Sequence, residues 1–339
     1  MSYQAHIVAA PNEYRLPWPG VKSISCVKFG CEGARDLVGV TGWDGSVFLY
    51  NVQDPNDVRQ AGFYFHGKPV LCCSFAGSAR MVSGGADNVV KVLDIATAKT
   101  ENLGKHDMPV RCVGYMDVTQ LVASGSWDKS VKLWDHRARG SAVSSDVLSD
   151  RVYAMDTKGH EIVVGTRDRK IYLYDIRNMQ NPVIRESPLR WQTRTVKYFP
   201  EESAFVVASI EGRVAVEYIS SEPEVLKKKY AFKCHRAKDT DGVELVYPVN
   251  ALAFHPKYSS LATGGSDKQV NIWDPFNRKR LVQLYKFDAS VVSLDFNHDG
   301  SQIAIASSYA YEDEEIPATL PPSTVTIRTL NDSDVKIKG

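Results

Sequence analysis

The feature that most constrains the fold is a short pattern that recurs seven times. Small residues precede an acid, and alternating apolar residues follow it, often ending in an aromatic residue and Asp. The acids of the first six copies are 43, 41, 40, 43 and 56 residues apart. The copies lie near residues 41–52, 83–95, 124–136, 164–176, 208–219, 263–275 and, in a degraded form, 303–330. A period of about 40–45 residues is typical of a β-propeller with one four-stranded blade per repeat.

We therefore predict an all-β protein, a seven-bladed WD40 propeller that occupies residues 1–339 as one domain. Residues 13–16 precede the first inner strand, and we expect them to close the ring as the outer strand of the last blade. Two segments depart from the period. Residues 220–246 lengthen the gap after the fifth copy, and the acidic, proline-rich residues 309–322 are expected to form a solvent-exposed loop inside the seventh blade.

Composition limits the possible partners. The chain has 41 Lys and Arg against 40 Asp and Glu, so a net charge of +1 gives no overall attraction to nucleic acid or membrane. The absence of a long apolar run, and of a basic-then-apolar N-terminus, argues against a membrane span or a secretory signal. None of the six cysteines forms a CxxC pair, so we expect no metal site. Cys26, Cys72 and Cys112 lie in short apolar runs and are expected to be buried core residues in a reducing compartment. The sequence has no P-loop or dinucleotide fingerprint, and we expect no cofactor.

One set of residues superficially resembles a hydrolase triad. His106, Ser124, Asp128 and Trp134 carry the residue types, but similar sets recur in other copies, for example Asp267 with Trp273. We interpret these residues as a buried hydrogen-bond network in each blade, because a catalytic set would not repeat with the fold. The protein is therefore predicted not to be an enzyme.

The turn before the hairpin acid lies on the face conventionally called the top, where it holds Trp43 and Trp127. Each Trp could cap its own blade or anchor a docked peptide. Inner strands begin with Arg111 in the third blade and Arg194 in the fifth, which places two guanidinium groups at the channel mouth. The pattern favours an acidic or phosphorylated peptide ligand. RNA is an alternative, but the Trp pair does not lie in a run of stacking platforms.

The fifth copy, SIEGRVAVEY (209–218), differs from the others. Glu211 and Glu217 replace the usual Asp and aromatic residue, and Arg213 lies between them. We expect Arg213 to face the ligand, near Arg194 and Lys233. Whether Glu217 orients these cations or pairs with a buried one is open.

Longer segments carry a more specific resemblance. Residues 211–218, 227–236, 247–256 and 263–281 resemble the Bub/Rae group of WD40 propellers, and the likeness extends over essentially the whole chain. Residues 125–135, 177–194 and 221–229 are most similar to the mitotic-checkpoint branch of that group. The sister branch serves messenger-RNA export at nuclear pores.

The resemblance implies a non-enzymatic spindle-checkpoint adaptor, nuclear and kinetochore-bound in mitosis. Such adaptors bind GLEBS segments of checkpoint kinases and their paralogues, bind phosphorylated MELT repeats of a kinetochore scaffold, and recruit the kinases to unattached kinetochores. It assigns Trp43, Trp127 and Arg194 to the GLEBS segment, with Arg111 beside them, and Arg213 and Lys233 to the phosphothreonine. Membrane and direct nucleic-acid binding are not expected. The alternative is an export propeller that binds a nucleoporin GLEBS segment.

Overall fold

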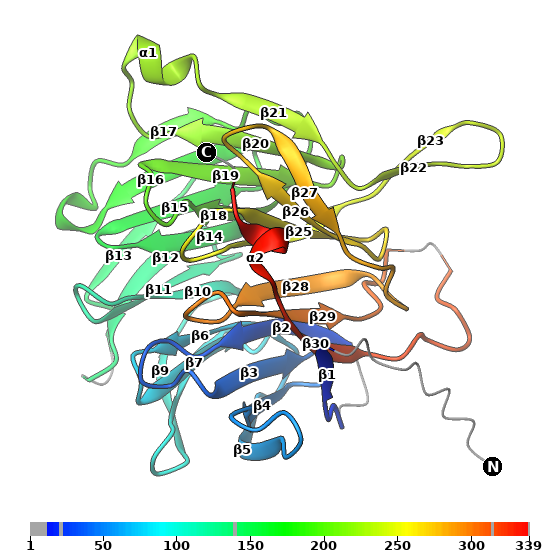
Figure 1. The fold of residues 1–339 in the computed structure, drawn as a ribbon. Helices are drawn as coiled ribbons and strands as arrows, with labels where there is room; N and C mark the ends of the chain where they lie inside the picture. The colour runs from blue at the N-terminus through cyan, green and yellow to red at the C-terminus, as the bar shows by residue number, and fades with distance from the viewer. Residues whose placement is uncertain (1–11, 20–22, 138–140, 313–314, 338–339) are drawn as a thin grey trace.

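The chain folds into seven four-stranded antiparallel sheets (Figure 1). Their inner strands together line a central channel. The structure is a computed structural model that describes residues 12–19, 23–137, 141–312 and 315–337. The seven-bladed WD40 propeller predicted from the repeat is confirmed. Neither α-helix in the described part of the chain is long and apolar enough to span a membrane.

Each blade is built in the same order, from the channel outward. The inner strands are β2 (Ile24–Phe29), β6 (Val70–Ala76), β10 (Val110–Met116), β14 (Val152–Lys158), β18 (Thr193–Tyr198), β24 (Val249–Phe254) and β28 (Val291–Phe296). The second strands are β3 (Leu37–Gly42), β7 (Arg80–Gly85), β11 (Leu121–Ser126), β15 (Glu161–Thr166), β19 (Ala204–Ser209), β25 (Leu261–Gly265) and β29 (Gln302–Ser307). The third strands are β4 (Ser46–Asn51), β8 (Val89–Asp94), β12 (Ser130–Asp135), β16 (Lys170–Asp175), β20 (Arg213–Tyr218), β26 (Val270–Asp274) and β30 (Thr324–Thr329). The outer strands are β5 (Arg59–Phe65), β9 (Lys99–Lys105), β13 (Ser144–Val147), β17 (Val183–Glu186), β21 (Tyr230–Lys233), β27 (Lys279–Gln283) and, for the seventh blade, β1 (Glu13–Leu16).

Ring closure by the N-terminal strand is also observed. Strand β1 pairs antiparallel with β30, and inner strand β28 contacts β2 of the first blade. Leu16 is buried under this joint, and the Glu13 carboxylate accepts a hydrogen bond from Arg328 at 2.9 Å. The first and last parts of the chain therefore share one sheet.

The core lies between the blades rather than inside any one of them. In the described residues, seven apolar clusters each join side chains of two neighbouring blades. Each blade is covered on both faces by its two neighbours. All six residues of β19 are therefore buried. Successive side chains of each third strand point to opposite faces of the blade, so they contribute to the clusters shared with both neighbouring blades.

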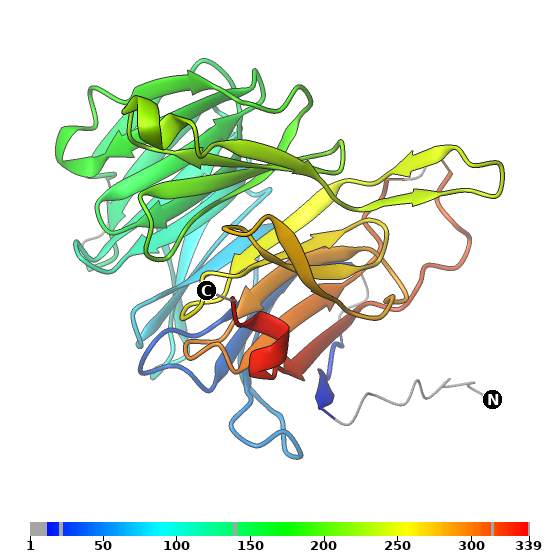
Figure 2. The same cartoon turned by 45° about the horizontal axis from the view of Figure 1, so that its top comes forward.

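Two insertions distinguish this propeller. A short helix α1 (Pro223–Leu226) lies within the fifth blade, between β20 and β21. Between the fifth and sixth blades, β22 (Arg236–Lys238) and β23 (Glu244–Val246) form a hairpin that projects from the ring (Figure 2). The 308–323 loop joins β29 to β30, as expected. Its predicted exposure is wrong for Tyr309, which is buried, whereas Tyr311 is exposed although its ring lies beside that of Trp43. Two further short elements are the 3-10 helix at Ile176–Asn178 and α2 (Asp332–Val335).

Candidate functional site

A repeated backbone hydrogen bond makes seven positions on the top face equivalent. In every blade, an N–H just after the second strand donates to the carbonyl that precedes the inner strand, at 2.8–3.1 Å in six blades and 3.2 Å in the fifth. The donating residues are Trp43, Ala86, Trp127, Arg167, Ile210, Ser266 and Ser308. One rigid frame thus carries seven different side chains on the same face, and recognition can depend on which side chains they are.

The two tryptophans of this set lie in different surroundings. Trp43 is 40% exposed, and its ring lies 6.2 Å from that of Tyr311. Trp127 is half-buried, and its Nε1 is buried without an acceptor among the described residues. The partial burial of Trp127 is consistent with a side chain that caps its own blade. Its indole N–H nevertheless lacks an acceptor among the described residues, and leaving it so costs free energy unless a ligand supplies the acceptor.

The channel mouth is formed by a bulge that occurs in all seven inner strands. One extra residue interrupts the pairing near the start of each inner strand. These residues are Ser25, Leu71, Arg111, Tyr153, Arg194, Asn250 and Val292, and all seven line one cavity of about 260 Å³. Arg111 and Arg194 are the two cations among them.

The two channel-mouth arginines differ in their contacts. Arg194 donates to Asn250 Oδ1 at 3.0 Å and lies 3.5 Å from a carboxylate oxygen of Glu312. Arg111 has no hydrogen bond or ion pair with any residue that the structure describes. Burial, and then the charge of Arg111, lowers the pKa of Arg194. Two guanidinium groups line the same cavity, and only Arg194 has a carboxylate beside it, so unsatisfied donors remain for an anionic ligand.

Arg213 and Lys233 lie directly opposite each other on β20 and β21. Arg213 is 3.7 Å from a carboxylate oxygen of Glu211, and Lys233 is 3.8 Å from one of Glu244. Both distances are too long for good hydrogen bonds. The fifth blade thus presents two cations side by side, whereas Arg194 of the same blade extends to the channel mouth.

The open question about Glu217 is answered by its contacts. Its carboxylate lies 2.6 Å from the Lys229 ammonium group, and the Glu217 residue is 9% exposed. Glu217 therefore pairs with a lysine of the connecting segment and leaves Arg213 to Glu211.

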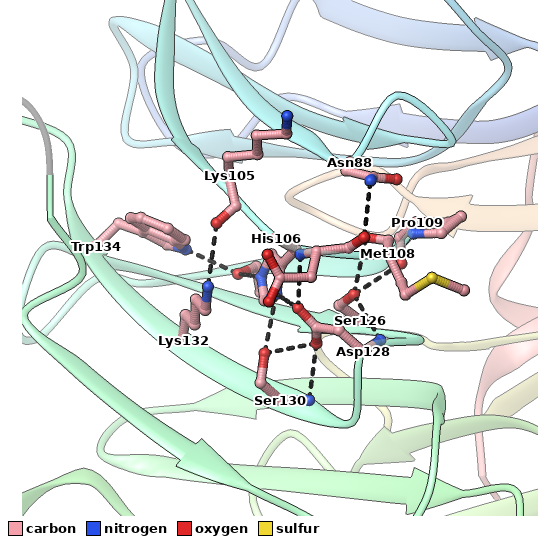
Figure 3. A network of polar contacts seen from close by, with 12 residues as sticks. Asn88, Lys105, His106, Met108, Pro109, Ser126, Asp128, Ser130, Lys132 and Trp134 are labelled. Atoms are coloured by element: carbon pink, nitrogen blue, oxygen red, sulfur yellow. Dashed lines mark hydrogen bonds and ion pairs between the residues drawn. The ribbon is translucent and has the colours of Figure 1, made fainter.

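The third blade contains a continuous polar network (Figure 3). The Trp134 indole N–H donates to Ser124 Oγ at 2.7 Å, and Ser124 Oγ lies 2.7 Å from His106 Nε2. His106 Nδ1 lies 2.9 Å from Asp128 Oδ2, and because a carboxylate only accepts, Nδ1 carries the proton. Burial alone would raise the pKa of Asp128, but hydrogen bonds from His106 and Ser130 outweigh it and hold the pKa well below its usual range.

Versions of this network occur in other blades. In the sixth, His235 joins Asp267 and Thr263 at 2.8 Å each, and the Trp273 N–H donates to Thr263 at 3.0 Å. In the second, His66 joins Asp87 and Ser83, and the hydroxyl of Tyr64 from the neighbouring blade replaces the indole. These side chains bond to one another inside the blades and occupy positions that connect strands.

The sequence analysis did not identify three residues that form these contacts, namely His235 and Tyr64 of the blade networks and Glu312 beside Arg194. His235 is separated from its inner strand by the β22–β23 hairpin, so the regular spacing that identifies His106 does not apply to it. Tyr64 comes from a different blade. Glu312 lies in a loop without a repeat pattern, although its charge beside two aromatic residues was a usable signal.

Comparisons with known proteins agree with this architecture. A family model described as WD domain, G-beta repeat matches residues 58–94, 98–135 and 229–274. The crystal structure of RRP9 WD40 repeats has a TM-score of 0.81, covers 95% of this chain and 98% of its own, and is 17% identical, a likeness that concerns the fold alone.

Two relatives are much more similar in sequence. The mRNA export factor GLE2 of Chaetomium thermophilum is 34% identical over 88% of this chain and 84% of its own. The mitotic checkpoint protein bub-3 of Caenorhabditis elegans is 52% identical over 99% of both chains. Because half of all residues are shared from one end to the other, the chain belongs to the Bub3 family of mitotic checkpoint WD40 proteins.

Proposed function

We propose that this protein is a spindle-checkpoint adaptor that reads a phosphothreonine on a kinetochore scaffold and brings GLEBS-containing checkpoint kinases, or their paralogues, to it. The observation that carries the proposal is the placement of Arg213 opposite Lys233. Like charges directly opposite each other destabilise a sheet. An anion bound between them would offset that cost.

A phosphorylated MELT repeat fits this pair chemically. A phosphothreonine brings a charge of nearly −2 and three acceptor oxygens, which an Arg and a Lys can share. The contacts of Glu211 and Glu244 at 3.7 and 3.8 Å leave donors on both cations free to turn toward phosphate. Loss of the phosphate would remove most of the attraction, so location would follow the phosphorylation state of the scaffold.

The GLEBS segment is assigned to the other half of the top face. Trp43 offers an exposed aromatic surface, and Trp127 offers an indole N–H that has no acceptor among the residues the structure describes. Aromatic residues with arginine dominate binding hot spots. Arg111 and Arg194 at the channel mouth suit acidic side chains of the segment. The proposal includes residence in the nucleus and at kinetochores in mitosis.

Catalysis is no part of this proposal. The WD40 checkpoint adaptor family is generally non-catalytic, and the His–Ser–Asp sets of this chain are bonded within blades. A general base would instead have to reach a substrate.

An export role is the second candidate, and the GLE2 relative favours it. Its 34% identity is lower than the 52% to the checkpoint protein, so the checkpoint role is preferred. The two roles separate in mitotically arrested cells, where kinetochore dots support the adaptor and retention at nuclear pores supports export.

The direct test is peptide binding by an Arg213→Glu variant. Titration of a fluorescent phospho-MELT peptide should show at least about a hundredfold loss of affinity, because a charge-assisted partner becomes a repulsive one. A Lys99→Glu variant, changed on exposed outer strand β9, should bind like the wild type. Unchanged affinity of the Arg213→Glu protein would refute the phosphothreonine assignment.

The GLEBS half is tested separately. A Trp43→Ala, Trp127→Ala double variant should lose a GLEBS peptide and keep the phospho-MELT peptide. Retention of the GLEBS peptide by a folded double variant would reject the tryptophan pair as its anchor.

A further inference from the structure

Cysteine occupies the same inner-strand position in three consecutive blades. This position follows the bulge residue, where pairing with the second strand resumes. Its side chains line the channel cavity of about 260 Å³ and are small in every blade, namely Cys26, Cys72, Cys112, Ala154, Thr195, Ala251 and Ser293. Because alanine, threonine and serine fill the position in the last four blades, the fold does not require a thiol there. We call Cys26, Cys72 and Cys112 the ring cysteines.

The ring cysteines differ in their surroundings. Cys72 and Cys112 are buried, as their apolar runs predict, whereas Cys26 is half-buried, so its predicted full burial is wrong. Burial raises the pKa of Cys72 and of Cys112, which keeps both thiols protonated. The Cys72 thiol donates to Gly84 O at 3.6 Å, but the Cys26 sulfur accepts a hydrogen bond from the Ser293 hydroxyl at 3.9 Å. Cys26 is therefore the ring cysteine that a small reagent in the cavity reaches most readily.

A further cysteine lies beside Cys26 across the joint between two blades. Cys73 of β6 is 2% exposed and belongs to the apolar cluster between the first and second blades, against which Cys26 of β2 packs. The equivalent residue is apolar in every other blade, namely Val27, Val113, Met155, Val196, Leu252 and Leu294. The second blade alone has a thiol at this position, and this thiol adjoins the half-buried ring cysteine.

The polar groups around Cys26 favour its thiolate. The Cys73 thiol donates a hydrogen bond to the Cys26 sulfur, and this bond lowers the pKa of Cys26 against the opposing effect of burial. The positive charge of Lys28 and the hydroxyl of Ser293 act in the same direction. The same hydrogen bond, together with burial, raises the pKa of Cys73, so the proton stays on Cys73. A nucleophilic sulfur thus lies next to a protonated one.

We propose that Cys26 and Cys73 are a redox-sensitive pair, in which a hydroperoxide oxidises Cys26 and Cys73 then closes a reversible disulfide between the first two blades. This inference does not depend on the proposed function. The bridge would join β2 directly to β6 and so fasten the blade that carries Trp43 to the next one.

The chemistry needs the peroxide as its only co-reactant. In the first step the Cys26 thiolate attacks one peroxide oxygen, an S–O bond forms, the O–O bond breaks, and hydroxide leaves and takes a proton from solvent. In the second step the Cys73 sulfur attacks the sulfenic acid, and the S–S bond forms as the S–O bond breaks. The Cys73 proton leaves with the hydroxyl group as water. Two thiols are oxidised to a disulfide and one peroxide is reduced to two waters.

The sibling blades supply substitutions that keep the frame. Cys26→Ser takes the residue of the seventh blade, and Cys73→Val takes that of the first, third and fifth blades. Cys72→Ala, which takes the residue of the fourth and sixth blades, is the matched control because it removes the neighbour of Cys73 at the ring position of Cys26. Circular dichroism and thermal unfolding check the three folds.

Treatment of the reduced full-length chain with hydrogen peroxide, followed by mass spectrometry, tests the pair. The wild type and Cys72→Ala should each lose the mass of two hydrogen atoms, and their non-reducing peptide maps should contain a Cys26–Cys73 cross-link that dithiothreitol removes. Cys26→Ser should form no cross-link. Cys73→Val should retain a sulfenic acid at Cys26, which dimedone traps.

Alkylation of the native wild type tests the activation of Cys26 separately. Iodoacetamide near neutral pH should modify Cys26 at least about tenfold faster than Cys72 or Cys112, because the thiolate is the reacting form. Equal rates at the three ring cysteines would contradict the activation.

Other outcomes overturn the inference. A cross-link that contains Cys72 or Cys112, or no cross-link in the oxidised wild type, contradicts the pair. A sulfenic acid that persists at Cys26 in the wild type leaves Cys73 without a role and also refutes it. If Cys26→Ser or Cys73→Val does not fold, the peptide map of the wild type decides by itself.

Discussion

At the scale of single residues, Ser124 is the joint of the third-blade network. Its hydroxyl oxygen bonds to both Trp134 and His106, and all three side chains are buried. Ser124→Ala should destabilise the protein by about 1–3 kcal/mol for each buried group left unpaired. Urea unfolding measures this loss. Ser145→Ala, on exposed β13, should change the free energy of unfolding little, and an equally small effect at Ser124 would contradict the structural role.

Asp128 makes the same network sensitive to acid. Its pKa is lower in the folded protein than in the unfolded chain, so its stabilisation is present above the unfolded pKa of about 3.9 and is lost as the pH falls toward the folded value. Asp128→Asn should be less stable than the wild type at pH 7, and the difference should shrink between about pH 5 and pH 2. Unfolding titrations at several pH values measure it. Asp241→Asn, on the projecting hairpin, should follow the wild type, and a constant deficit for Asp128→Asn would contradict the linkage.

The residues of this network show where sequence reasoning works. His106, Ser124, Asp128 and Trp134 could be grouped because the repeat fixes their spacing and the strands fix their directions. The partners of Arg194 could not be found this way. Asn250 lies 56 residues away and Glu312 lies 118 residues away, and their approach depends on the closed ring rather than on any local pattern.

At the scale of elements, the 308–323 loop covers part of the proposed peptide site. Tyr311 packs on Trp43, and Glu312 lies against Arg194. A GLEBS peptide that uses these residues has to displace both contacts. A Tyr311→Ala, Glu312→Gln variant should therefore bind the peptide several-fold more tightly in a fluorescence titration, because the competing contacts are gone.

The loop offers its own control. Glu315→Gln changes an exposed acid of the same loop and should leave GLEBS affinity unchanged. Weaker binding by the Tyr311, Glu312 variant would mean that these side chains help to hold the peptide. The sequence predicted a loop here because of its prolines and charges, but its docking on Trp43 depends on contacts between the seventh and first blades.

At the scale of the whole molecule, stability depends on the joint between the chain's two ends. Leu16 is 4% exposed and belongs to the cluster that joins the seventh and first blades. Leu16→Ala should cost about 2–5 kcal/mol, as other buried leucines do. Val147→Ala, at a residue that is 75% exposed on an outer strand, should cost little. Urea denaturation compares them, and similar small losses would mean that β1 is not needed for closure.

This joint was predictable because a propeller leaves no other partner for residues 13–16. The projecting hairpin was not, since residues 236–246 have no counterpart in the other repeats and their pairing depends on local register. The long spacing between the fifth and sixth repeats indicates an insertion, but only the structure shows that it forms a hairpin.

The bulge shared by the seven inner strands has an evolutionary consequence. Each extra residue leaves the ladder of its own strand intact on either side, so its side chain can be exchanged without disturbing the blade. The seven bulge positions around one opening can therefore vary independently of one another. In this protein they hold Ser, Leu, Arg, Tyr, Arg, Asn and Val. After gene duplication, a propeller can acquire a new binding partner through single substitutions at these seven positions, while selection for folding acts on the remaining residues.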